Sequence, residues 1–186
     1  MATIIGISGS LRQQSFNSAL LNAAVSLAPS GMHIQTRSIT EVPLYNYDIE
    51  KAQGVPEPVE QLKRAIAAAD GLLICTPEYN NSMPGVLKNV IDWLSRPPDD
   101  IQRVFGGLPV GIMGASPGRF GTLLSQNAWL PVMRTLGTRL WSGGRLMVTG
   151  ASKVFDDEGA IVDEGTRERL QKFLDGFAAF IESNHR

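Results

Sequence analysis

Near the N-terminus stand Thr3-Ile-Ile-Gly-Ile-Ser8 and, directly after them, Gly9-Ser-Leu-Arg-Gln-Gln-Ser-Phe-Asn17. The first run is short, rich in β-branched residues and apolar at both odd and even positions, which predicts a strand buried on both faces. Phe16 to Ala28 then places apolar residues at helical spacing, and Pro29-Ser30-Gly31 ends that helix. The chain therefore opens with a strand, a polar turn and a helix, which is the basic unit of an α/β fold.

The same alternation continues along the whole chain. Further strands are predicted at 33–39, 71–76, 109–115 and 139–148, the last interrupted by Gly143-Gly144; helices are predicted at 59–69, 85–95, 122–136 and about 170–181, and 40–58 is predicted to be a long loop. Strands that alternate with helices imply a parallel sheet covered on both sides. We expect residues 1–186 to form a single three-layer α/β domain.

Charge balance and residue counts exclude several classes of function. Lys and Arg total 17 against 18 for Asp and Glu, so no excess of positive charge is available for nucleic acid or an anionic membrane. One cysteine, Cys75, excludes an intrachain disulfide framework and suits a reducing compartment. Two histidines, His33 and His185, argue against a zinc site or a histidine triad. Without an apolar run of roughly 20 residues or a secretory signal, we expect a cytoplasmic protein with no bound metal.

The turn after the first strand has the composition of an anion site. It gathers Ser8, Ser10 and Ser15 with Arg12 and Asn17 at the start of a helix, where unpaired N–H groups and the helix dipole favour a phosphate. Capping of the helix by Ser15 alone leaves Arg12 and Asn17 unexplained. Neither a triphosphate P-loop nor a Gly-x-Gly-x-x-Gly dinucleotide turn is present. The pattern favours a phosphate-bearing cofactor over phosphoryl transfer.

Two more polar loops follow the third and fourth predicted strands, and ligands bind beyond the carboxyl ends of such strands. Thr76-Pro-Glu-Tyr-Asn-Asn-Ser-Met-Pro-Gly85 is stiffened by two prolines and suits the hydrogen-bonding edge of a planar heterocycle. Gly114-Ala-Ser-Pro-Gly-Arg-Phe-Gly121 lets the backbone approach a ligand closely. Cys75 itself lies within a predicted buried strand and is interpreted as a core residue.

Taken together, Gly9 to Asn17, Thr76 to Asn80 and Pro84-Gly-Val-Leu-Lys-Asn-Val-Ile-Asp-Trp93 resemble the NAD(P)H-dependent FMN reductases, in particular the chromate and quinone reductase and azoreductase-like branch. The resemblance covers nearly the whole chain in order. It implies a flavodoxin-like α/β/α sandwich with a five-stranded parallel sheet of order 2-1-3-4-5, non-covalent FMN, NAD(P)H as co-substrate, and a homodimer or homotetramer.

The resemblance also implies which residues bind the cofactor. Those around the phosphate are Ser10, Arg12, Ser15, Phe16 and Asn17. Those bordering the isoalloxazine ring are Pro77, Glu78, Tyr79 and Asn80, and the site is completed by Ser116 and Gly118 with Gly121 nearby. Backbone N–H groups around Tyr79 and Asn80 are expected to stabilise negative charge on the reduced flavin.

The expected activity is a ping-pong transfer of hydride from NAD(P)H through flavin N5 to a small acceptor, namely a quinone, an azo compound, chromate or free flavin, with no catalytic side chain. A flavodoxin-type electron carrier is the alternative, although such carriers are usually strongly acidic. A flavin-free interaction protein on the same scaffold is a third alternative, disfavoured by the three polar loops. Trp93 is interpreted as a core residue, and the 40–58 loop as a lid or subunit contact.

Overall fold

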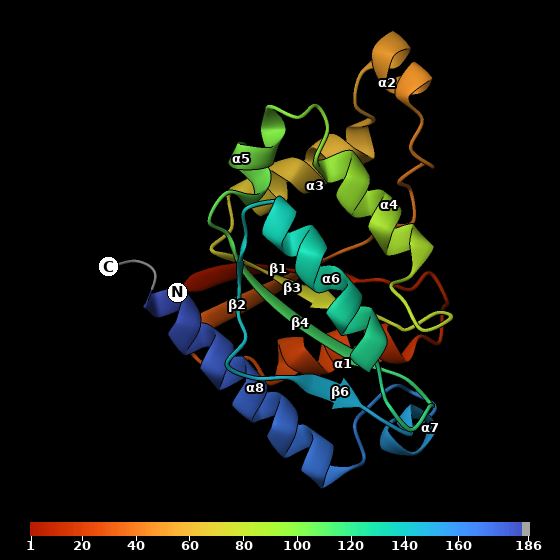
Figure 1. Ribbon diagram of the computed structural model, residues 1–186. Coiled ribbons are helices and arrows are strands. Elements are labelled where there is room, and N and C mark those ends of the chain that lie inside the picture. The colour runs from red at the N-terminus through yellow and green to blue at the C-terminus, as the bar shows by residue number, and fades with distance from the viewer. Residues whose placement is uncertain (184–186) are drawn as a thin grey trace.

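A computed structural model describes residues 1–183 and shows a parallel sheet between two layers of helices (Figure 1). His185 lies outside the described residues. In chain order the elements are β1 (Ala2–Ser8), α1 (Phe16–Ser26), β2 (Met32–Arg37), α2 (Tyr47–Gln53), α3 (Glu57–Ala67), β3 (Gly71–Cys75), α4 (Gly85–Leu94), α5 (Asp100–Phe105), β4 (Pro109–Ala115), α6 (Leu123–Thr135), β5 (Arg139–Leu140), β6 (Leu146–Val148), α7 (Ala151–Val154) and α8 (Glu164–Glu182).

The sheet has the strand order β2-β1-β3-β4-β5, and every pairing is parallel. The predicted flavodoxin-like order is confirmed, with a sixth strand added. The predicted strand at 139–148 is two short strands, because β5 pairs with the start of β4 and β6 pairs with its end. The interruption at Gly143-Gly144 separates these two segments along one edge of β4.

Side chains of the central strands pack into two separate hydrophobic cores, one on each face of the sheet. Ile4 packs in the core under α1 and α8, whereas Ile5 and Ile7 pack in the core under α3, α4, α5 and α6. Figure 1 shows α1 and α8 on one side of the sheet, with α3, α4 and α5 on the other. Burial on both faces explains why the strands read as continuous apolar runs. Within residues 1–183, no helix combines the length and the apolar character needed to cross a bilayer.

The segment predicted to be a long loop, 40–58, contains a helix. α2 begins after Asn46, whose side chain accepts a hydrogen bond from the Asp48 N–H at 2.8 Å. None of its seven residues is buried, and it projects from the body of the molecule (Figure 1). α3 also begins earlier than predicted, at Glu57, because a proline at Pro58 is tolerated in the first helical turn, where its missing N–H has no intrahelical partner.

A second difference from the sequence-based prediction is α5, a short helix held to α3 by a buried lysine. The Lys63 side chain has no exposed surface and contacts Glu60 Oε1 at 3.2 Å, Asp100 Oδ2 at 2.9 Å and the carbonyl oxygen of Arg96. Arg103 donates two further hydrogen bonds to the Asp100 carboxylate, at 3.0 and 2.9 Å. A buried ammonium that is surrounded by acceptors in this way ties the two helices together.

These contacts predict an acid-sensitive contribution to stability. Hydrogen bonds from Arg103 and then from Lys63 lower the pKa of Asp100 from 3.8 to about 2. Because the folded-state pKa is depressed, the stabilisation is present above the unfolded pKa and is lost as the pH falls from about 4 towards 2. Asp100→Asn should therefore lower the free energy of unfolding by about 2 kcal/mol at pH 7.

Urea denaturation at pH 7, 4 and 3 measures this difference between wild type and variant. We expect the difference to shrink as the pH falls. The matched control is Asp99→Asn, since Asp99 is the exposed neighbour and makes no side-chain capping bond. An Asp100→Asn deficit that stays constant from pH 7 to pH 3 would contradict the ion-pair explanation.

Candidate functional site

Three loops meet at the carboxyl edge of the sheet, where β1, β3 and β4 are neighbours. The Gly9 N–H donates to the Cys75 carbonyl at 2.8 Å, and the Thr76 N–H donates to the Met113 carbonyl at 2.9 Å. The junction needs glycine, because a Cβ on Gly114 would lie 2.2 Å from the Thr76 carbonyl oxygen. Backbone contacts therefore fix the three loops relative to one another.

The loop between β1 and α1 presents several backbone donors without acceptors. Ser15 caps the helix, its Oγ accepting from the N–H groups of Asn17 at 3.2 Å and Ser18 at 3.3 Å. The backbone N–H groups of residues 13–16 donate to no acceptor within residues 1–183. Unpaired N–H groups at the positive end of a helix form an anion-binding site.

Arg12 adds a positive charge beside these donors. Its side chain is exposed, its Cζ lies 5.0 Å from the centre of the Phe16 ring, and it forms no ion pair with a carboxylate in the described chain. Phe16 stacks in turn on Phe155, with ring centroids 6.0 Å apart. The Ser10 Oγ accepts from the Arg12 N–H at 3.3 Å and so shapes the loop. The predicted phosphate residues are thus brought together, with the guanidinium available to an anion.

Asn17 occupies a different position from the other predicted phosphate residues. It is buried, its Nδ2 donates to the Ala115 carbonyl at 2.9 Å, and its Oδ1 accepts from the Ala115 N–H at 2.9 Å. These two bonds join the first turn of α1 to the end of β4. In this structure the Asn17 side chain holds the loop after β1 against the end of β4.

The loop between β3 and α4 folds into a tight turn. Tyr79 and Ser82 exchange two backbone hydrogen bonds of 3.0 Å, and Asn80 and Asn81 between them have φ of 50° and 61°. Two left-handed residues in succession mark a type I′ turn, which asparagine tolerates well. The Tyr79 N–H is used within the turn, whereas the N–H groups of its neighbours Glu78 and Asn80 have no acceptor in residues 1–183. The sequence-based hypothesis for Tyr79 N–H is thereby corrected.

Glu78 directs its side chain away from this turn. Its Oε2 accepts from the N–H groups of Leu124 at 2.8 Å and Ser125 at 3.1 Å, at the start of α6. Pro77 beside it is buried. The loop thus combines a rigid turn with a carboxylate that is already hydrogen-bonded.

The loop between β4 and α6 is stabilised by its own side chain and by the turn before α7. The Ser116 Oγ accepts from the Gly118 N–H at 3.1 Å, and the Gly118 carbonyl accepts from the N–H groups of Gly121 and Gly150 at 3.5 and 3.4 Å. Gly121 has φ of 62°, a conformation that favours glycine. Phe120 between these glycines is 76% exposed, so this loop gives the edge an aromatic rim.

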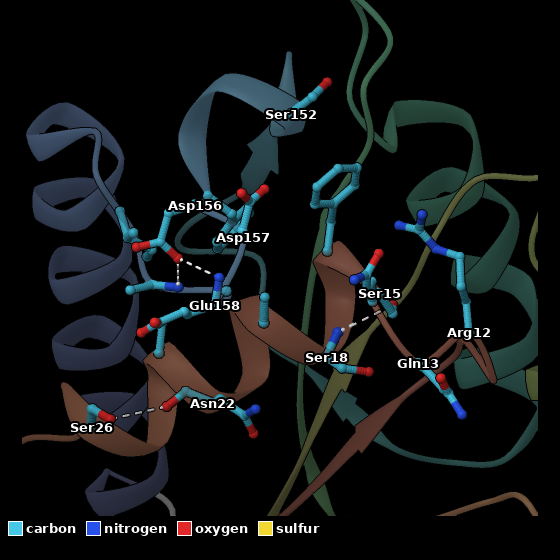
Figure 2. A pocket seen from close by; sticks show the side chains of 18 of the residues that line it. Arg12, Gln13, Ser15, Ser18, Asn22, Ser26, Ser152, Asp156, Asp157 and Glu158 are labelled. Atoms are coloured by element: carbon cyan, nitrogen blue, oxygen red, sulfur yellow. Dashed lines mark hydrogen bonds between the residues drawn. The ribbon is translucent and has the colours of Figure 1, made fainter.

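A cavity of about 620 Å³ lies on the other flank of α1 (Figure 2). It meets the loop after β1 at Arg12 and Ser15 and continues along α1 past Ser18, Asn22 and Ser26, opposite the acidic turn 156–158. The hydroxyl and amide residues at 15, 18, 22 and 26 share one helical face, a polar periodicity from which this cavity could have been predicted. No residue of the other two loops lines it, so of the three loops it borders the loop after β1 alone.

Sequence reasoning missed a buried polar cluster under the site. The Thr76 Oγ1 lies 2.8 Å from the Ser125 Oγ and accepts from the Trp129 Nε1 at 3.1 Å, and all three residues are buried. Thr76 directly follows β3, and its two partners lie in α6, 49 and 53 positions further along the chain. Threonine, serine and tryptophan at such separations carry no local signal.

The projecting segment that contains α2 is anchored on α4. The Asn89 Oδ1 accepts from the Tyr45 N–H at 2.8 Å, and the Asn89 Nδ2 and Trp93 Nε1 donate to the Pro43 carbonyl at 2.8 and 2.9 Å. The Trp93 side chain has no exposed surface, which confirms its interpretation as a core residue. Leu44 and Tyr47, in contrast, are 80% and 56% exposed.

A doubly wound parallel sheet with an anion-binding turn after its first strand defines a flavodoxin-like protein that binds a phosphate-bearing cofactor. More particularly, the chain belongs to the NADPH-dependent FMN reductase family, whose model matches residues 2–153. The predicted family, fold and oxidoreductase class are confirmed, and FMN and NAD(P)H are the cofactor and co-substrate of this family.

Known proteins resemble the chain over nearly its whole length. It is 44% identical to an NAD(P)H-dependent FMN reductase of Pseudomonas aeruginosa over 178 residues, covering 96% of this chain and 94% of the relative. It is also 44% identical to a 2-hydroxy-1,4-benzoquinone reductase of a Burkholderia species over 173 residues, covering 93% and 92%. The solved structure of a flavoenzyme NAD(P)H:(acceptor) oxidoreductase from Paracoccus denitrificans superposes with a TM-score of 0.88 at 34% identity, covering 99% of both chains.

The position of Asn17 yields a stability prediction. Asn17→Ala leaves the buried N–H and carbonyl of Ala115 without partners, which should lower the free energy of unfolding by about 2–4 kcal/mol. The control is Asn22→Ala, a change of the same residue type at an exposed position of the same helix. Urea denaturation that ranks the two variants equally would contradict the supporting role of Asn17.

Proposed function

We propose that this protein is an FMN-dependent oxidoreductase that reduces quinones with NAD(P)H. The observation that carries the proposal is the set of unpaired N–H groups at residues 13–16 beside the free guanidinium of Arg12. A flavin monophosphate supplies the dianion that such donors accept. The relatives described above are reductases of FMN and of quinones, which supports the same conclusion.

The residues present fit the cofactor at both of its ends. The phosphate would be held by Arg12, Ser10, Ser15, Phe16 and the N–H groups of 13–16, with Asn17 fixing the loop from below. The ring would lie against a second set of residues, namely Pro77, Glu78, Tyr79 and Asn80 in the loop after β3, and Ser116, Gly118 and Gly121 in the loop after β4. In the second set, backbone groups and the Tyr79 ring are the available contacts.

When bound, FMN supplies the redox chemistry, the transfer of hydride from NAD(P)H through N5 to the acceptor. The chain supplies position and charge. The N–H groups of Glu78 and Asn80 have no acceptor among residues 1–183 and serve to stabilise negative charge on the ring edge. Because a bound flavin can hold the hydride between two half-reactions, donor and acceptor would use one slot in turn, in ping-pong order. No side chain is assigned a role as acid or base.

The rim of the slot favours planar apolar acceptors. The exposed large apolar residues around the three loops are Leu11, Tyr79, Phe120 and Leu124, which are 49%, 46%, 76% and 42% exposed. Aromatic and aliphatic surface of this kind suits a quinone or an azo dye better than an oxyanion such as chromate. A pure electron carrier is disfavoured by the balance of 17 basic and 18 acidic residues.

We also infer that the protein acts as a homodimer or homotetramer. None of the seven residues of α2 is buried, and two large apolar residues, Leu44 just before the helix and Tyr47 at its start, are 80% and 56% exposed. Contact with a second copy would cover this segment, and light scattering gives the mass of the assembly. The single cysteine supports a cytoplasmic location.

The proposed activity predicts a yellow protein that is bleached by NADPH or NADH in the absence of oxygen. Initial rates with NAD(P)H and a benzoquinone should give parallel double-reciprocal lines, because the two substrates react in separate half-reactions. Intersecting lines would contradict the ping-pong order. A protein that binds FMN but is not bleached by either nucleotide would instead support the electron-carrier alternative.

A second prediction concerns the phosphate. Arg12→Ala should weaken FMN binding by about 1.5–3 kcal/mol, the scale of a hydrogen bond to a charged group, and should leave the fold intact. Fluorescence titration of the apoprotein measures the affinity. Arg134→Ala, at an exposed arginine in the last turn of α6, is the control and should bind FMN as the wild type does. Equal FMN affinities of the two variants would show that Arg12 does not contribute to phosphate binding.

A further inference from the structure

α6 begins without a cap from its own sequence. Thr122 stands at the N-cap position but its side chain caps no N–H group, and the first turn contains no acidic residue. The positive end of this thirteen-residue helix is satisfied instead by Glu78, which lies 46 residues before Leu124 in the chain. A carboxylate at this position receives both hydrogen bonds and the attraction of the helix dipole.

The same loop is attached to α6 at a second point. Thr76 and Glu78 flank the buried Pro77, and both contact Ser125: the Thr76 Oγ1 lies 2.8 Å from the Ser125 Oγ, and the Glu78 Oε2 accepts from the Ser125 N–H at 3.1 Å. The Trp129 indole adds a bond to Thr76 one turn further along the helix. Two attachments on either side of a proline leave the start of this loop little freedom to move independently of α6.

The geometry of Glu78 separates its role from that of a flavin ligand. A single oxygen, Oε2, accepts both N–H bonds at 2.8 and 3.1 Å. The negative charge of the Glu78 carboxylate is therefore compensated by the N-terminus of α6, and we assign it no direct interaction with the flavin. The backbone N–H groups of Glu78 and Asn80 remain the donors that the loop offers to the ring edge.

We propose that Glu78 is a positioning residue that couples the flavin-binding loop after β3 to the N-terminus of α6. FMN binding to the loop then makes the first turn of α6 more ordered, and an ordered first turn strengthens FMN binding. The inference rests on the proposed function, because it requires FMN to contact this loop. It assigns Glu78 a role through the backbone of its neighbours in place of a direct contact with the cofactor.

Glu78→Ala and Glu78→Gln distinguish the role of the side chain as a hydrogen-bond acceptor from the role of its negative charge. Glutamine keeps one oxygen where Oε2 lies and can accept both N–H bonds, so Glu78→Gln should bind FMN within about 3-fold of the wild type, whereas Glu78→Ala should bind at least about 10-fold more weakly. Asp163→Ala is the matched control, since Asp163 caps α8 through the Thr166 N–H at 2.7 Å, away from the three loops. It should lose thermal stability but retain FMN affinity.

Hydrogen exchange tests the coupling itself. In the wild type, FMN should slow exchange of the Leu124 and Ser125 amides by at least about 10-fold, with no change at Thr166; in Glu78→Ala this protection should vanish. If Glu78→Ala does not fold, the wild-type measurement alone decides the matter, and unprotected amides at α6 overturn the coupling.

The remaining outcomes are distinct from one another. Equal loss of FMN affinity in Glu78→Gln and Glu78→Ala would show that hydrogen-bond acceptance at α6 does not account for the effect, which overturns the proposed positioning role. Wild-type affinity in Glu78→Ala would overturn it as well. A wild-type protein that binds no FMN at all would instead refute the proposed function.

Discussion

The pairing of the Asn17 amide with the backbone of Ala115 is the interaction on which the site depends. It satisfies a buried N–H and a buried carbonyl at the end of β4 and fixes the first turn of α1 directly beside them. The open donors of residues 13–16 therefore stand at a set position relative to the loop that begins at Ser116. Without that clamp, an anion held by the first loop would have no fixed relation to the third.

At this edge of the sheet, polar side chains mainly hold the loops in place, whereas backbone N–H groups remain free to bind a ligand. Ser15, Asn17, Glu78 and Ser116, which have the polar side chains expected to bind a ligand, are bonded to their own loops or to neighbouring ones. Among residues 1–183, the peptide N–H groups of residues 13–16 at this edge have no partner, and Arg12 adds a positive charge beside them. A site built from peptide dipoles needs little rearrangement when charge develops on its ligand.

The sequence predicted the elements whose signal is local and missed those whose partners are remote. Parallel strands buried on both faces appear as continuous apolar runs, so the strands and the loop after β1 could be predicted from the residues. The strand order came from the resemblance to the FMN reductases. The partner of Asn17 lies 98 residues away and the partner of Glu78 46 residues away, so no local pattern distinguishes a ligand from a support. α5 was missed because it is only six residues long and depends on Lys63, a residue type normally expected on the surface.

The interior position of Cys75 matters for an enzyme proposed to handle quinones, which are electrophiles that add to thiolates. The thiol has no exposed surface, and burial raises its pKa well above the usual value, so it stays neutral and out of reach. Because the chain contains no other cysteine, it offers its substrates no exposed thiol to arylate. Thiol arylation is therefore closed as a route by which the proposed substrates could inactivate the protein.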